Sequence, residues 1–156
     1  MRVKGDIDGA IAAYQHAVKN LQTVRQDLST TYRGSDISFR EKAGQVFLEL
    51  ADLLLKRAEA QTNPTAVQDA LKGVRDTIEL LRRAELCDYF QDACVTTLQE
   101  KEIQLERLEG IAGHTAVVYP IIFPDRLELL LNLPDETIKR FIVRDDQAIY
   151  SKSRQK

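Results

Sequence analysis

Residues 117–131 read VVYPIIFPDRLELLL, and they follow a long stretch of helical pattern. The segment from Thr115 to Phe123 is rich in β-branched and aromatic residues, which is typical of a strand. Pro124-Asp125 then supplies a turn. After it, a leucine series alternates with a second series, the period of a strand with one buried face. The leucines are Leu127, Leu129, Leu131 and Leu133, and the second series is Glu128, Leu130 and Asn132.

A third strand is expected after the turn at Pro134-Asp135, over Ile138 to Val143. The three segments predict an antiparallel meander. Pro120 lies inside the first strand and favours an edge or a bulge there. Three strands cannot bury both faces alone, so either the helices cover one side or another structure continues the sheet.

The preceding residues show helical periodicity. From Asp6, apolar residues recur every three or four positions until Gly34-Ser35. Ser38 to Glu41 forms a capping box, which predicts the start of a second helix. The expected core faces are Ala10, Ile11, Tyr14, Ala17, Val18, Leu21, Val24 and Leu28 in the first helix, and Phe39, Ala43, Val46, Phe47, Leu50, Leu53, Leu54 and Ala58 in the second.

A third helix is expected from Asn63 as N-cap and Pro64 as first helical residue. Its apolar face continues into a fourth segment, with a join near Ala84 to Asp88 and a helix end at Gly110. The face is Val67, Leu71, Val74, Ile78 and Leu81, and the fourth segment carries Cys87, Phe90, Cys94, Leu98, Leu105 and Leu108.

Composition narrows the function classes. The chain has 156 residues, 44% of them hydrophobic and 29% charged, the balance of one ordinary soluble domain. A net charge of −2 supplies no broad basic field, which argues against nucleic acid as a partner. Apolar runs are too short for a membrane span, and two cysteines form no disulfide framework. We therefore expect a cytoplasmic protein that contacts neither nucleic acid nor membrane.

The residues suited to nucleophilic chemistry are Cys87, Cys94, His16 and His114. Both cysteines fall on the apolar helical face, where cysteine usually packs as a small hydrophobe. Metal-ligand spacing and phosphate-binding loops are missing from the sequence. We therefore expect a non-enzyme with no metal and no cofactor. The alternative is a small cysteine-dependent hydrolase that uses Cys94 and His114.

Three stretches support a family resemblance. Residues 5–18, GDIDGAIAAYQHAV, look like the second helix of a tetratricopeptide repeat (TPR), in which Ala10 and Ala17 allow close helix approach and Tyr14 fills the gap. The phrases AELCDYFQDAC and YPIIFPDRLELLL resemble the junction between such repeats and the caspase-like CHAT peptidase domain of bacterial TPR-CHAT proteins. The resemblance implies that the strands begin a CHAT domain. Its catalytic residues cannot be carried over, because both cysteines precede His114 and no βαβ core follows Val143.

The expected fold is mostly α within the α+β class: TPR-like helical hairpins followed by a small antiparallel β-meander. We divide the chain into a half repeat (1–34), a region of about three helices (35–110), the meander (115–143) and a tail (144–156). The expected function is that of a non-catalytic scaffold that binds proteins or peptides, among them a caspase-like domain. The alternative without catalysis is a homo-oligomer that pairs through the hairpin edge. The expected partner-binding residues are Ala10, Tyr14, Ala17, Tyr119 and Arg126.

Overall fold

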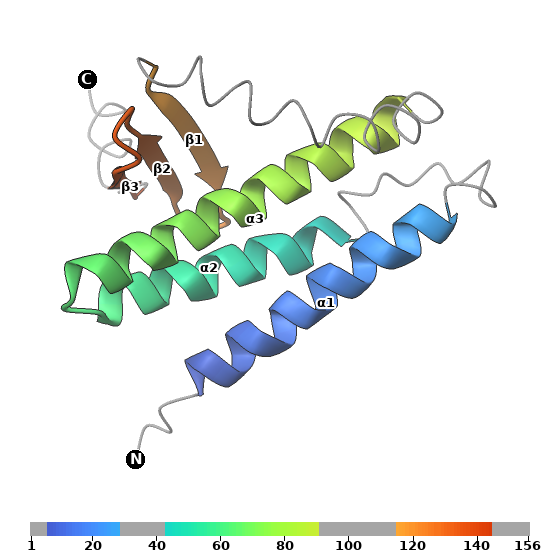
Figure 1. The fold of residues 1–156 in the computed structure, drawn as a ribbon, viewed down its shortest axis with the longest axis horizontal. Helices are drawn as coiled ribbons and strands as arrows, with labels where there is room; N and C mark the ends of the chain where they lie inside the picture. The colour runs from blue at the N-terminus through green and yellow to red at the C-terminus, as the bar shows by residue number, and fades with distance from the viewer. Residues whose placement is uncertain (1–5, 29–42, 91–114, 145–156) are drawn as a thin grey trace, which may run out of the picture.

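The computed structural model describes residues 6–28, 43–90 and 115–144. They form three helices followed by a three-stranded antiparallel sheet, which confirms the mostly α member of the α+β class (Figure 1). The elements are α1 (Ile7–Leu28), α2 (Gln45–Ala60), α3 (Pro64–Phe90), β1 (Val117–Ile122), β2 (Leu127–Asn132) and β3 (Ile138–Val143).

Helix α1 begins directly after Asp6, whose carboxylate accepts the backbone N–H of Gly9 at 2.8 Å. This bond satisfies one of the free N–H groups of the first turn. The expected apolar face is the one that packs, because Ile11 and Val18 are buried while His16 on the opposite side is exposed. The amphipathic period therefore fixes which side of α1 meets α2.

Helices α2 and α3 form a hairpin. The expected N-cap of α3 is confirmed, since Asn63 Oδ1 accepts the N–H of Thr65 at 2.9 Å. The predicted join near Ala84 to Asp88 is wrong, because α3 runs unbroken to Phe90. Residues 80–90 contain neither glycine nor proline, so nothing in that stretch ends the helix. The capping box at 38–41 and the helix expected beyond residue 90 lie outside the described residues.

One apolar core joins the helices to the sheet. Its centre is formed by Phe47, Leu55 and Val74, which are fully buried between α2 and α3. Gly73 faces α2, where a Cβ would make an ordinary van der Waals contact with the Leu54 side chain, 3.4 Å away. On the sheet side, Tyr119, Ile121, Leu130 and Ile138 belong to the same core.

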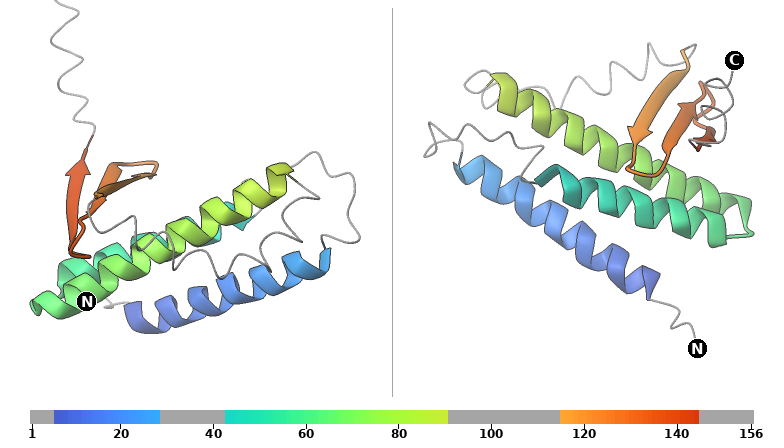
Figure 2. Two further views of the ribbon diagram at one scale, coloured as in Figure 1. Left: turned by 45° about the horizontal axis from the view of Figure 1, so that its top comes forward. Right: turned by 180° about the vertical axis from the view of Figure 1, so that it is seen from behind.

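The molecule has three layers: α1, then the α2–α3 hairpin, then the sheet (Figures 1 and 2). The sheet covers the side of the hairpin opposite α1, and its strand order is β1-β2-β3. The helices therefore cover one face of the sheet and leave the other face pointing away from them.

The face of β2 that packs on the helices is the one with Glu128 and Leu130, both fully buried. Leu127, Leu129 and Leu131 lie on the opposite face and are only partly buried. The leucine alternation indicated one buried face without assigning it, and the structure assigns it to Glu128 and Leu130. The reason is tertiary: a buried carboxylate is tolerated here because Arg126, just before β2, and Arg140 of β3 bind it.

Candidate functional site

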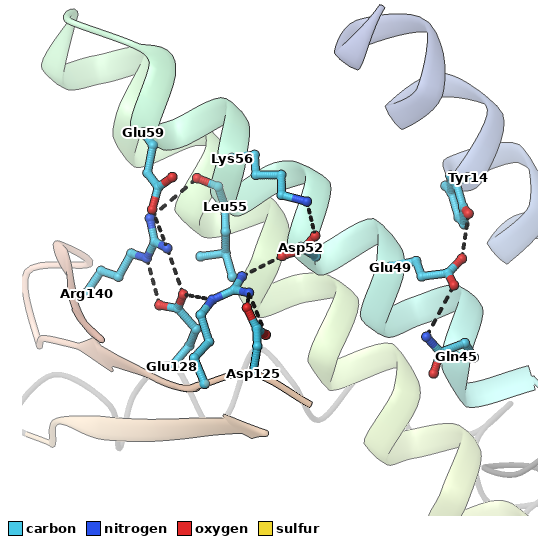
Figure 3. Close-up of polar contacts among 11 residues, drawn as sticks. Tyr14, Gln45, Glu49, Asp52, Leu55, Lys56, Glu59, Asp125, Glu128 and Arg140 are labelled. Carbon is cyan, nitrogen blue, oxygen red and sulfur yellow. Dashed lines mark hydrogen bonds and ion pairs between the residues drawn. The ribbon is translucent and has the colours of Figure 1, made fainter. Parts of the chain in front are cut away.

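A buried ion-pair cluster attaches the sheet to α2. We call it the Glu128 cluster, and it comprises Asp52 and Glu59 of α2, Arg126, Glu128, and Arg140 of β3 (Figure 3). Glu128 has an exposed fraction of 0%, and the two arginine side chains are each 13% exposed. The sheet is thus held to the helices by charge pairing as well as by apolar contact.

Both arginines bind the Glu128 carboxylate. Arg140 donates from Nε and Nη2 to the two carboxylate oxygens, at 2.8 and 2.7 Å, and Arg126 Nε donates to Oε1 at 2.7 Å. Two parallel bonds from one guanidinium fix its orientation. Arg126 also donates to Asp52 and stacks over the Phe123 ring, 4.4 Å from its centroid.

The second arginine reaches α2 directly. Arg140 Nη1 donates to the backbone carbonyl of Leu55 at 3.4 Å, and its Nη2 lies 2.9 Å from the Glu59 carboxylate. Figure 3 shows Arg140 between Glu128 on the sheet and Glu59 on the helix. Each buried charge of the cluster is therefore paired with at least one group of opposite charge.

The electrostatics favour the charged state of the cluster. Burial by itself would raise the pKa of the Glu128 carboxyl, but the hydrogen bonds from Arg140 and Arg126 outweigh it and hold that pKa below its usual value. The pKa of Asp52 is lowered in the same way: burial opposes the shift, and the bonds from Arg126 and Lys56 prevail. Both carboxylates are ionised at neutral pH.

We expect the cluster to make stability fall in acid. Because the folded-state pKa values of Glu128 and Asp52 lie below the reference values of 4.5 and 3.8, their contribution is complete above those values and is lost as pH falls through the folded pKa. Urea unfolding between pH 7 and pH 3 measures this loss. The variant Glu128→Gln should lose stability at pH 7 and show a shallower decline in acid. An unchanged decline in Glu128→Gln would assign the acid sensitivity to other groups.

The sheet's second face is apolar and uncovered by the helices. Cross-strand partners point to the same side, so the register defines this outer face. Its members are Val118, Pro120, Ile122, Leu127, Leu129, Leu131, Lys139, Phe141 and Val143. Ile122 is 71% exposed, and Val118, Phe141 and Val143 are each at least 50% exposed. Lys139 is its one charged residue.

The helical residues expected to bind a partner lie on one side of α1. Tyr14 is half-buried, and its hydroxyl donates to the Glu49 carboxylate, which raises the pKa of the phenol. Ala10 and Ala17 are half-buried on the same side of α1. The three residues thus share a surface, and part of it is already used to pack α1 on α2.

The two expected sheet residues make intramolecular contacts. Tyr119 is buried on the helix side of β1, and the Arg82 guanidinium lies 5.2 Å from its ring centroid. Burial, followed by the nearby Glu79 carboxylate, raises the pKa of Tyr119. Arg126 is held in the Glu128 cluster. Neither side chain is directed towards the outer face, so the structure separates both from the exposed apolar surface.

The candidate hydrolase residues Cys94 and His114 lie outside the described residues, and for Cys87 only the helical backbone is described. Across residues 6–28, 43–90 and 115–144, no group of three or more His, Cys, Asp or Glu side chains could hold a metal ion. In those same ranges, none of the helices combines the length and apolar character needed to span a bilayer.

Sequence reasoning missed Glu128, Arg140 and Asp52 as a connected set. One signal was present: Glu128 interrupts a leucine run near the start of a strand, and a charge there requires a partner if that face is buried. The partners are distant in sequence, since Asp52 and Arg126 are separated by 74 positions. Periodicity along one strand does not report such pairs.

Comparisons with protein-family models, curated proteins and solved structures find no match to this chain, so the outer face and the Glu128 cluster carry the functional reasoning.

Proposed function

We propose that this chain is a non-catalytic protein-interaction region whose sheet docks a second protein through its outer face. The helices then act as a platform that holds the sheet in place. The caspase-like domain that the TPR-CHAT resemblance implies is our candidate occupant. The observation that carries the proposal is the outer face itself, which presents eight apolar residues and one lysine to solvent.

The arrangement of the two faces supports this reading. Folded monomers rarely expose contiguous apolar patches of this kind, and those that do usually bind a partner there. The inner face is occupied by the helices and fixed by the Glu128 cluster, so the outer face is the one left for a partner. A complementary surface would be apolar at its centre, with an acidic group placed to meet Lys139.

The test uses a photo-crosslinking residue at position 122 in cells that make the protein. The captured protein is identified, purified and titrated against the wild-type chain by calorimetry. We expect Ile122→Glu to weaken binding at least about tenfold, because it places a charge in an apolar contact. Gln15→Glu adds the same charge to the exposed side of α1 and should leave affinity unchanged.

Three results would overturn the proposal. One is the absence of any crosslinked product at position 122. Another is capture of a second copy of this chain, which would make the outer face a self-association surface. The third is a purified partner that binds Ile122→Glu as tightly as it binds the wild-type chain, because docking would then occur elsewhere.

A further inference from the structure

The hairpin hydrogen bonds define which backbone groups face the two free edges of the sheet. Phe123 N–H donates to the Arg126 carbonyl, and Leu133 N–H donates to the Thr137 carbonyl, each at 2.9 Å. Hydrogen-bonded and non-hydrogen-bonded pairs alternate along antiparallel strands. By this alternation, the outward-directed residues are Val118, Pro120 and Ile122 on β1, and Ile138, Arg140 and Ile142 on β3.

The β1 edge is closed to a further strand. Pro120 has no N–H, and it occupies the middle outward position of β1. Proline at such a position costs the sheet no internal bond, and it prevents another strand from pairing there. The sequence expectation of an edge at Pro120 is thus met, since β1 lies at the margin of the sheet.

Within the described ranges the β3 edge is open beyond Ile138, and Gln68 shows how a group can bind there. The Gln68 amide pairs with Ile138 in both directions: Ile138 N–H donates to Gln68 Oε1 at 2.9 Å, and Gln68 Nε2 donates to the Ile138 carbonyl at 3.1 Å. A residue of an added strand would form the same two bonds, accepting from a β3 N–H and donating to the C=O of the same β3 residue. Among the described residues, the N–H and C=O groups of Arg140 and Ile142 have no backbone partner across this edge.

The side chains beside this edge differ on the two faces. On the outer face, the exposed Phe141 and Val143 offer apolar contact. On the inner face, a polar cavity of about 240 Å³ lies at the end of β3. Four cationic side chains and two carboxylates line it: Lys56, Arg126, Arg140, Arg144, Glu59 and Asp125. Lys56, Arg126 and Arg140 are already paired with carboxylates, whereas Arg144 has no ion pair among the described residues. Arg144 therefore favours an anionic group from a ligand.

We infer, on the basis of the function proposed above, that the partner supplies an extended segment that adds to β3 as a fourth strand. Its backbone pairs with Arg140 and Ile142. Apolar residues alternate with acidic residues in this segment, because successive side chains of a strand point to opposite faces. The apolar residues lie beside Phe141 and Val143, and the acidic residues face the cavity at Arg144.

The test measures fluorescence anisotropy of a short labelled peptide in which valine alternates with glutamate. We expect saturable binding to the wild-type chain and to Ile142→Ala, which keeps the backbone N–H. Ile142→Pro removes that N–H from the free edge and should weaken binding at least about tenfold. A peptide in which lysine replaces glutamate should bind more weakly than the original, because its charge repels the cavity.

Two controls keep the result interpretable. Circular dichroism checks that Ile142→Pro is folded, and a peptide N-methylated on its pairing bonds tests the same contact against the unchanged protein. Binding by this peptide as tight as by its parent would overturn the inference, as would no binding of the parent. Dimerisation of the free chain that Ile142→Pro abolishes would also overturn it, since a second copy would then occupy the edge.

The peptide result is separable from the proposed function. Ile122 lies on the outer face of β1, the strand at the opposite edge of the sheet from β3. If the peptide fails to bind while Ile122→Glu still weakens the purified partner, only the fourth-strand inference fails. If Ile122→Glu has no effect on the partner while the peptide binds, only the docking face is wrong.

Discussion

Replacing Glu128 by alanine is expected to lower the free energy of unfolding by about 3–5 kcal/mol, the cost of removing one partner from a buried ion pair. The substitution removes the carboxylate that both Arg126 and Arg140 bind, and it leaves two guanidinium groups that are each 13% exposed without the partner they share. Urea denaturation at neutral pH measures the change. We expect the sheet to lose its attachment to α2 before the helices unfold.

A matched control is available in the same cluster. Glu59 also pairs with Arg140, at 2.9 Å, but its side chain is half exposed. Glu59→Ala should therefore cost about 1 kcal/mol or less, as exposed ion pairs do. Equal losses of stability in Glu128→Ala and Glu59→Ala would show that burial does not make the Glu128 ion pairs more important than an exposed ion pair. Replacing Arg126, Glu128 and Arg140 together with apolar residues should recover most of the stability, because no unpaired charge remains.

The second large effect is expected at the centre of β2. Leu130→Ala should cost about 2–5 kcal/mol, because this side chain is fully buried between the sheet and the helices and its loss leaves a cavity. Leu129→Ala deletes the same atoms from the neighbouring residue, which lies on the outer face, and should cost about 1 kcal/mol or less. Thermal and urea unfolding of both variants give the comparison.

The leucine pair tests the assignment of the two sheet faces. A larger loss from Leu129→Ala than from Leu130→Ala would reverse them, and the outer face would then be the structural one. The proposed docking surface depends on this order. If Leu130→Ala costs more, as expected, a partner that covers the outer face should raise the free energy of unfolding of the wild-type chain. The contacts of the Glu128 cluster should stay the same.

Local signals in the sequence were sufficient for the three strands and their turns. β3 begins and ends where the pattern placed it, at Ile138 and Val143, and β2 begins at Leu127 as expected. Pro124-Asp125 and Pro134-Asp135 restrict the backbone of adjacent residues, so they report turns regardless of what packs against them. The helix N-cap at Asn63 is local in the same sense, because its side chain bonds to a residue two positions later.

The candidate site was less accessible to sequence reasoning. Tyr14, Ala10 and Ala17 were placed on one face of α1 by their period, and they do lie together. Tyr119 and Arg126 were also expected to bind a partner, but the sequence does not say which way a side chain in the hairpin points. Both make contacts with residues of other elements, Arg82 for Tyr119 and Asp52 for Arg126.

What the sequence determined by itself is thus the three strands with their turns and the apolar faces of the described helices, because these depend on contacts within a few residues. What only the tertiary structure decided is which face of the sheet is buried. Alternation along β2 is compatible with either face. The choice depends on Asp52, Glu59 and Arg140, which come from other elements and make burial of the Glu128 carboxylate favourable. That choice directs the leucines outward and creates the surface proposed to bind a partner.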